Sequence, residues 1–335
     1  MLPEGFTLLL VAVIALAVIF DYINGFHDTA NAIATSVATR ALSPRLAIAM
    51  SAAANFGGAL VGTEVAKTVG SGIVHATDAN QTVVAAALLG AIAWNVLTWR
   101  LGIPSSSSHA LIGGLLGASF AAVGVSSWNV DGIVGKVLLP LVGSPIVGGI
   151  AGFFLMVLIY NVFQRANPQR LHGIFRRLQV LSAGYMAFSH GSNDAQKTMG
   201  IMTLALVTGG LQTAFEPPLW VILLAASAIS LGTAAGGWRI IKTMGTKVVK
   251  LDPVHGFAAE TTAATVIFTA SHFGMPVSTT HVISSAIMGV GSVERFSALR
   301  WGIVRSILTA WVLTIPLSAL TAAVAYFVIR PFVGG

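Results

Sequence analysis

The chain has no cysteine and very few charged residues for its length of 335 residues. The absence of cysteine excludes disulfide bridges and thiolate metal sites. Only 9% of the residues are charged, and 55% are hydrophobic, whereas globular domains carry about a quarter charged residues. A composition so poor in charge is not that of an ordinary soluble protein.

Long apolar segments take the place of the missing charge. Segments of spanning length recur from end to end, so the sequence predicts a polytopic, all-α membrane protein. The predicted segments are Thr7–Thr39, Ala47–Thr63, Thr82–Trp99 with Ser105–Val123, Val137–Tyr160, Leu178–Val207, Leu219–Gly237, Phe257–Phe273 with Val277–Val290, and Ile303–Ile329. Glycine pairs at a spacing of four, such as Gly58/Gly62 and Gly232/Gly236, let helices approach closely in lipid.

The positive charges predict how the chain lies in the membrane. Thirteen of the 18 basic residues fall in four loops. These loops lie on the same side of the membrane if each single segment crosses it once and each pair of segments joined by a short turn returns to the side from which it started. These loops are Arg40–Arg45, Asn161–Arg177, Trp238–Asp252 and Val293–Arg305. We expect the protein to lie in the inner membrane of the cell. Because basic loops stay in the cytoplasm, we expect both termini on the opposite side of that membrane. Topology explains the net charge of +7, so no nucleic-acid partner is expected.

A few charged residues remain at or near membrane depth. They are Asp21, Asp28, Arg100, Asp194, Lys197 and Glu260. Each costs about 2.5–3.5 kcal/mol at the centre of a helix, so such residues are candidates for function. Asp21 and Arg100 are the weakest candidates, because either side chain could reach an interface.

Two polar stretches interrupt the apolar pattern and resemble each other. Ser189–Gly200 reads SHGSNDAQKTMG, and Asp21–Asn31 reads DYINGFHDTAN; laid over each other, they place Asp28 on Asp194. A slightly longer shift along the chain places PSSSSH at Pro104–His109 on PVSTTH at Pro276–His281. The predicted topology makes the two repeats inverted.

Inverted repeats are typical of transporters, in which broken helices and hairpins meet near the bilayer midplane. We therefore expect helices broken at the two polar stretches and two helical hairpins. The expected division is 1–160 for the first repeat with its flanking helices, 161–178 for a basic cytoplasmic loop, and 179–335 for the second repeat with a C-terminal helix.

The serine and threonine runs suit a small oxyanion. Exposed N–H groups and hydroxyls at a helix start form an anion site, although a serine there can instead cap its own helix. Neutral amides of the polar stretches suit phosphate oxygens or helix packing. The predicted anion-binding residues are Asn31, Ser105, Ser106, Ser107, Ser108, Asn193, Gln196, Ser278, Thr279 and Thr280. Ser106 and Ser278 are expected to act as symmetry mates.

The buried acids suit a hard cation such as Na⁺, which takes oxygen ligands. Asp28, Asp194 and Glu260 are the predicted cation-binding or coupling residues. The alternative is that these acids pair with Lys197 or with histidines and hold the helices together. His109 and His281 are expected to be structural, since each stands alone in its repeat.

An intramembrane hydrolase is the rival class. It is disfavoured because the chain lacks a Gly-x-Ser-x-Gly elbow. Ser108 and His109 are adjacent in the sequence, and neighbours at that spacing do not face each other on a helix. We therefore expect no enzymatic activity and no cofactor beyond a coupling ion.

These motifs resemble those of the inorganic phosphate transporter (PiT) family. SHGSNDAQKTMG is similar to the second-repeat signature of bacterial members, and GFHDTANAIAT to the first-repeat signature, with His27 where Asn is usual. The hairpin motifs and GFAAETTA at Gly256–Ala263 also resemble family motifs, and the match runs from about Phe20 to Gly291. The resemblance implies Asp28, Asn31, Asn193 and Asp194 at the ion and phosphate site.

The predicted function is secondary active transport of inorganic phosphate, coupled to Na⁺ or H⁺ by alternating access. The alternative cargoes are sulfate, which is also tetrahedral, and a metal–phosphate complex. The expected partners are phosphate, the coupling cation and the lipid bilayer. The oligomeric state is left open, with a homodimer as one option.

Overall fold

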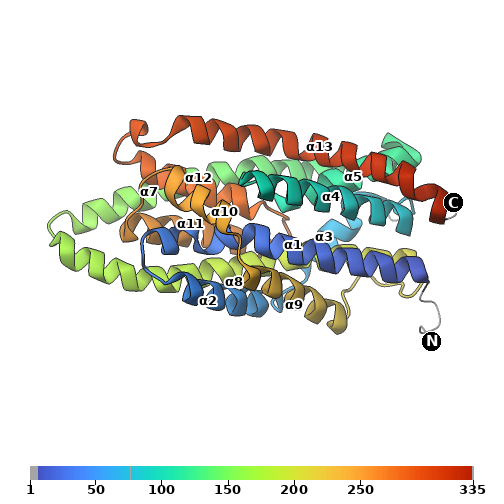
Figure 1. Ribbon diagram of the computed structural model, residues 1–335, viewed down its shortest axis with the longest axis horizontal. Helices are drawn as coiled ribbons and strands as arrows, with labels where there is room; N and C mark the ends of the chain where they lie inside the picture. The colour runs from blue at the N-terminus through green and yellow to red at the C-terminus, as the bar shows by residue number, and fades with distance from the viewer. Residues whose placement is uncertain (1–6, 76, 334–335) are drawn as a thin grey trace.

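The computed structural model describes residues 7–75 and 77–333, which form an elongated bundle of helices (Figure 1). The α-helices are α1 (Leu8–Ala38), α2 (Pro44–Ala59), α3 (Glu64–Ser71), α4 (Gln81–Leu101), α5 (Ser107–Val123), α6 (Val130–Gly132), α7 (Leu139–Phe163), α8 (Pro168–Thr208), α9 (Leu219–Ala235), α10 (Trp238–Lys242), α11 (Pro253–His272), α12 (Thr279–Ser292) and α13 (Trp301–Val333). Short 3-10 or π-helical turns are η1 (Val125–Ser127), η2 (Ile133–Leu138), η3 (Thr243–Lys247) and η4 (Phe296–Ala298). No β-strand forms within these described ranges.

The predicted all-α membrane architecture is confirmed. Among the described residues, four helices are long and apolar enough to cross a membrane, and two bent helix pairs raise that number to six if each pair is one span. The bent pairs are α2 with α3, at 74°, and α9 with α10 and η3, at 61°. The protein is therefore an integral membrane protein with broken helices.

The positions of the breaks differ from the prediction. The polar stretches do not interrupt their helices, because α1 runs unbroken for 31 residues and α8 for 41. Apart from Pro168 at its first position, α8 contains no proline, and α1 contains none. Polar side chains of both stretches, such as Asn31 and Lys197, reach partners on the hairpins, and these contacts are compatible with an unbroken helix.

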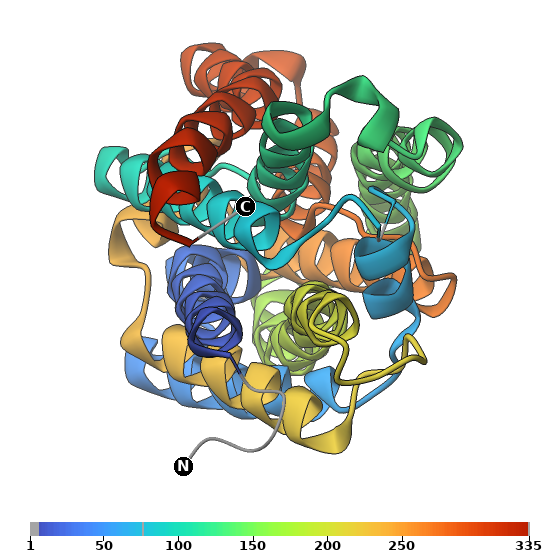
Figure 2. The ribbon, with the colours of Figure 1, turned by 90° about the vertical axis from the view of Figure 1, so that its right-hand side faces the viewer.

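Glycines place the two motif helices close to their neighbours. A Cβ atom at Gly25 would collide with the backbone of α9, and one at Gly232 would collide with the backbone of α1. In the same way, Gly58 abuts the backbone of α8 and Gly191 abuts that of α2. The small-residue pattern thus packs α1 against α9 and α8 against α2, as expected for helices that associate in lipid. Figure 2 shows α1 and α8 side by side near the centre of the bundle.

Two helical hairpins, α4–α5 and α11–α12, lie toward opposite ends of the molecule. The first lies toward the end where both termini are found, and the second toward the other end (Figure 1). Gly102 and Gly274 end the first leg of each hairpin at the same backbone angle, φ = 67°. Matching hairpins at opposite ends are what an inverted repeat requires. The inverted relation and the division at residues 160 and 179 stay predictions.

Candidate functional site

The polar stretches of α1 and α8 meet the tips of both hairpins in the interior. On α1, His27 Nδ1 lies 2.6 Å from Asp28 Oδ1, and His27 Nε2 lies 3.2 Å from Thr98 Oγ1 on α4. Ser105, at the first hairpin tip, donates to Thr98 Oγ1 at 2.8 Å. Asp28 is therefore linked through one histidine to the first hairpin.

Asn31, one turn after Asp28, reaches the second hairpin. Its amide Nδ2 donates to Thr280 Oγ1 at 2.9 Å and to Thr279 Oγ1 at 3.3 Å. The Thr279 hydroxyl in turn donates to Asp194 Oδ2 at 3.2 Å. A hydroxyl of the second hairpin thus bridges the motif residues of α1 and α8, although they are far apart in the sequence.

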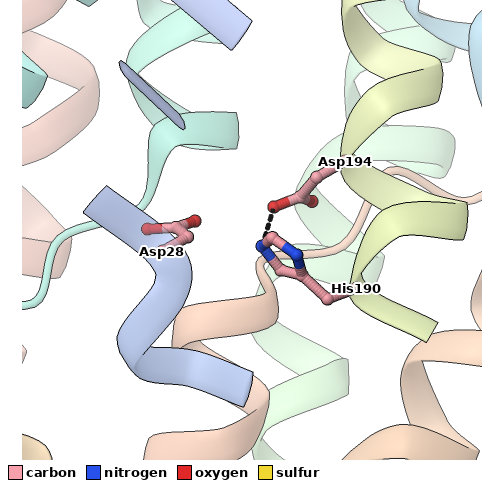
Figure 3. A group of neighbouring side chains, drawn as sticks. All are labelled: Asp28, His190 and Asp194. Atoms are coloured by element: carbon pink, nitrogen blue, oxygen red, sulfur yellow. Dashed lines mark ion pairs between the residues drawn. The ribbon is translucent and has the colours of Figure 1, made fainter. Parts of the chain in front are cut away.

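The two aspartates face each other across the centre of the bundle. Figure 3 shows Asp28 on α1 opposite Asp194 and His190 on α8. One ligand atom from each of these three residues lies within 4.8 Å of the others, and all three residues are buried. His190 Nε2 lies 3.1 Å from Asp194 Oδ2, while its Nδ1 lies 2.9 Å from Asn55 Oδ1 on α2. Two carboxylates at this separation need positive charge between or beside them, because like charges repel strongly at low dielectric.

Lys197 supplies one such charge. Its Nζ donates to Asp194 Oδ1 on its own helix, to the hydroxyl of Ser108, and to the carbonyl oxygen of Val277 at 2.8 Å. Only 3% of the Lys197 side chain is exposed. Ser108 also donates to Val277 O at 3.3 Å. The ammonium therefore joins α8 to both hairpin tips at once.

The predicted serine and threonine residues lie at the hairpin tips, in two kinds of environment. Ser106 Oγ accepts from His109 N at 3.1 Å, and Ser278 Oγ accepts from His281 N at 3.3 Å, so both serines cap their own helices. Ser107 Oγ is buried and has no hydrogen-bond partner among the described residues. Both hairpin helices begin among buried residues, and the free N–H groups of a helix start are suited to stabilise an anion.

Three predicted residues lie away from this centre. Asn193 donates to Ser271 Oγ at 2.7 Å, and Gln196 contacts the backbone of the α2–α3 bend. The Glu260 carboxylate accepts from Gln179 at 3.1 Å, from Ser182 at 2.5 Å, and from Thr35. Glu260 therefore belongs to a second polar cluster between α1, α8 and α11, and its role as a cation ligand stays a prediction.

Three buried residues have surroundings that the sequence did not reveal. Asp21 does not reach an interface: its side chain is buried, and neither carboxylate oxygen has a hydrogen-bond partner within the described ranges. His109 and His281 contact each other, with ring centroids 4.3 Å apart in an edge-to-face arrangement, and their structural role stays a prediction. His281 also stacks on Trp311 at 3.8 Å. Each histidine belongs to a different repeat, and only the meeting of the hairpins pairs them.

The sequence reasoning missed the residues that orient the two aspartates. His27, Thr98, His190 and Asn55 all contact the centre directly or through one neighbour. For His190 a signal was present, because it precedes Asp194 by four residues and faces it on one helix. No comparable signal marks Thr98 or Asn55, whose contacts depend on tertiary packing.

The arrangement can hold an anion and cations together. Hydroxyls, amides and helix N-termini from both hairpins suit a tetrahedral oxyanion. The facing carboxylates suit a hard cation beside it. The centre also joins elements that lie toward opposite ends of the bundle, as a site that opens alternately to each side must do.

Comparison with known proteins gives a consistent result. The model of the phosphate transporter family matches residues 24–322. A relative from Bacillus subtilis (strain 168), named "Probable low-affinity inorganic phosphate transporter", is 48% identical over 326 residues, which cover 96% of this chain and 98% of the relative. A relative of the same name from Rhizobium meliloti (strain 1021) is 48% identical over 321 residues, which cover 95% of this chain and 96% of the relative.

A solved structure, named "The sodium-dependent phosphate transporter", is similar to the chain with a TM-score of 0.90. The two are 25% identical, and the match covers 98% of this chain and 100% of the other. These relatives and the structural neighbour are transporters and not enzymes.

Proposed function

The chain belongs to the phosphate transporter family, and from that premise we propose that it carries inorganic phosphate across the inner membrane by symport with a cation. The observation that carries this proposal is the meeting of Asp28, Asp194 and both hairpin tips in one buried centre. A binding centre between elements that lie toward opposite ends of the bundle fits alternating access.

The proposed phosphate site lies between the hairpin tips. Ser105, Ser106, Ser107 and Ser108 of the first hairpin and Ser278, Thr279 and Thr280 of the second would supply hydroxyl and N–H donors, with Asn31, Asn193 and Gln196 as amides. The buried hydroxyl of Ser107, which has no hydrogen-bond partner within residues 7–75 and 77–333, supports this assignment, because such groups are rarely left without a partner. Asn193 and Gln196 would act mainly by holding α8 in place, since their amides contact α11 and the α2–α3 bend.

The proposed coupling site is the space between Asp28 and Asp194. Na⁺ is favoured over H⁺, because the similar solved structure is that of a transporter named as sodium-dependent. Radiolabelled phosphate uptake into proteoliposomes tests this with an imposed Na⁺ gradient, an imposed H⁺ gradient, or neither. We expect uptake with the Na⁺ gradient at constant pH, and competition by unlabelled phosphate but not by equimolar sulfate. Uptake driven only by the H⁺ gradient would mean that H⁺, and not Na⁺, is the coupling ion. No uptake under any gradient would refute the symport.

The proposed orientation places the basic loops in the cytoplasm. Ala166 in the α7–α8 turn and Asp131 in α6 are both exposed. Because the natural chain has no cysteine, Ala166→Cys and Asp131→Cys each give a single reactive thiol. An impermeant thiol reagent on intact cells should label position 131 and not position 166. The opposite pattern would reverse the orientation.

A further inference from the structure

Lys197 stands where the first polar stretch has a neutral amide. The alignment that places Asp28 on Asp194 also places Asn31 on Lys197, because each follows its aspartate by three positions. Both side chains therefore point from the same side of their helix, relative to the aspartate. The two stretches differ by a full positive charge at this one position.

The contacts of these two residues also correspond. Asn31 donates to Thr280 on the second hairpin, and Lys197 donates to Ser108 on the first. The alignment of PSSSSH with PVSTTH places Ser108 on Thr280, because each directly precedes the histidine of its motif. Each motif helix thus holds the equivalent hydroxyl of the other repeat's hairpin, with an amide in one case and an ammonium in the other.

The oxygens around Lys197 Nζ are of the kinds that bind a small hard cation. They are a carboxylate oxygen of Asp194, the hydroxyl of Ser108 and the carbonyl of Val277. Carboxylate, hydroxyl and carbonyl oxygens together are typical ligands of hard cations. An ammonium has three N–H donors, and all three are used here. The charge is buried, so it is stable only while these partners remain in place.

We propose that Lys197 is a tethered cation: its ammonium permanently fills the cation position between Asp194 and the hairpin tips. This inference rests on the proposed function. It distinguishes a cation position that binds an ion from solution from one that a side chain of the protein fills. Within the described part of the chain, the basic group paired with Asp28 is the imidazole of His27 and not a lysine. The mobile coupling cation would then bind on the Asp28 side, and the Asp194 side would need none.

The test is to remove the ammonium of Lys197 and to measure whether a free Na⁺ ion takes its place. In purified Lys197→Ala, phosphate binding is measured by equilibrium dialysis at several Na⁺ concentrations, with choline keeping the ionic strength constant. We expect binding without Na⁺ to be weaker than in the wild-type protein by roughly 10-fold or more, because a charged hydrogen-bond partner is lost. Added Na⁺ should restore it, and the slope of log affinity against log Na⁺ concentration should rise by about one, as for one additional bound ion.

Two variants serve as controls. Lys197→Arg keeps the charge and should keep the wild-type Na⁺ slope. Lys67→Ala removes a lysine that also pairs with an acid three residues before it, Glu64, at 3.2 Å, but at an exposed site. It should change neither affinity nor slope.

A readout without phosphate separates this inference from the proposed function. Na⁺, compared with choline, should raise the melting temperature of Lys197→Ala more than that of the wild-type protein. Weakened phosphate binding with an unchanged Na⁺ slope would mean that Lys197 contacts phosphate itself, and the tethered cation would be refuted. Unchanged affinity and slope would also refute it, leaving Lys197 as a tie between helices. If the wild-type protein bound no phosphate at any Na⁺ concentration, the proposed function would fail, and the melting temperatures alone would decide the role of Lys197.

Discussion

Asp28 and Asp194 occupy corresponding positions in the two polar stretches, yet their surroundings differ. Asp28 is paired with His27, a residue whose charge depends on protonation. Asp194 is held by Lys197, faces His190, and accepts from Thr279. Two positions that look equivalent in sequence are therefore unequal in charge. Asp194 thus has an ammonium partner inside the protein, whereas Asp28 has only an imidazole, and it is beside Asp28 that we propose the coupling cation binds.

The largest expected effect is that of Asp194→Asn. It would leave the Lys197 ammonium buried without its carboxylate, and breaking a buried ion pair costs about 3–5 kcal/mol. We expect a strongly lowered melting temperature in detergent and no phosphate uptake. The double variant Asp194→Asn/Lys197→Met should recover much of the stability but not the transport.

The control for Asp194→Asn is Glu64→Gln. It breaks an acid–lysine pair of the same spacing at an exposed site, where such pairs contribute at most about 1 kcal/mol. A melting temperature for Asp194→Asn within the range of Glu64→Gln would contradict the buried ion pair.

Asp28→Asn should have a similar effect on transport and a much smaller effect on stability. The amide oxygen of the variant still accepts a hydrogen bond from His27, so the loss is about 1 kcal/mol, the difference between a charged and a neutral acceptor, and no buried ammonium loses its partner. We expect gradient-driven phosphate uptake to fall to background while the protein inserts and purifies as usual. If Asp28→Asn transported with unchanged cation dependence, Asp28 would have a structural role and the coupling site would lie elsewhere.

Ser106 and Ser278 test whether the two hairpin tips are equal even though the two acids are not. Each hydroxyl accepts a cap bond from its own helix and donates to no described residue, so its proton is available to phosphate. A hydrogen bond to a charged group contributes about 1.5–3 kcal/mol, so Ser106→Ala and Ser278→Ala should each weaken phosphate binding by roughly 10- to 150-fold. Ser126 is exposed in η1, and Ser126→Ala should bind phosphate as the wild-type protein does.

Loss at only one of the two serines would indicate a lopsided phosphate site. No loss at either would mean that both hydroxyls only cap their helices.

The smallest effect concerns Asp252, the acid at the start of α11. Asp252 caps α11 by accepting from Val254 N and His255 N, both at 2.9 Å. Burial raises the pKa of its carboxyl, but the hydrogen bonds and charges of His255 and the charge of His172 outweigh burial, so the pKa lies below its ordinary value. The carboxylate therefore stabilises the fold above pH of about 4, and this contribution disappears as pH falls through the lowered pKa.

Asp252→Ala should lower stability by about 1 kcal/mol at pH 7, as for loss of a helix cap. The difference in melting temperature between variant and wild type should shrink below pH of about 4. A difference that grew on acidification would contradict the lowered pKa. The Asp252 side chain is 34% exposed, so water can replace its carboxylate in the variant, whereas the Asp194 side chain is only 1% exposed.

Much of the architecture followed from the sequence because its causes are local. Apolar length predicted the membrane class, and the short gaps between paired apolar segments predicted the turns of both hairpins, where the structure has Gly102 and Gly274. The continuity of α1 and α8 could not be predicted, since it depends on partners such as Thr279 and Ser108 that reach the polar side chains from distant parts of the chain. The same holds for the contact between His109 and His281, which exists only because the two hairpin tips meet.

The glycine contacts divide the molecule into parts that can diversify and parts that cannot. At Gly25, Gly58, Gly191 and Gly232 even one additional methyl group would meet the backbone of a neighbouring helix. A lineage that acquired a new anion preference would have to leave these four positions unchanged. Its substitutions would collect instead at the hairpin tips, where a serine and a threonine can be exchanged without moving a helix. The spacing of the helices would be inherited, and selectivity would be the part that evolves.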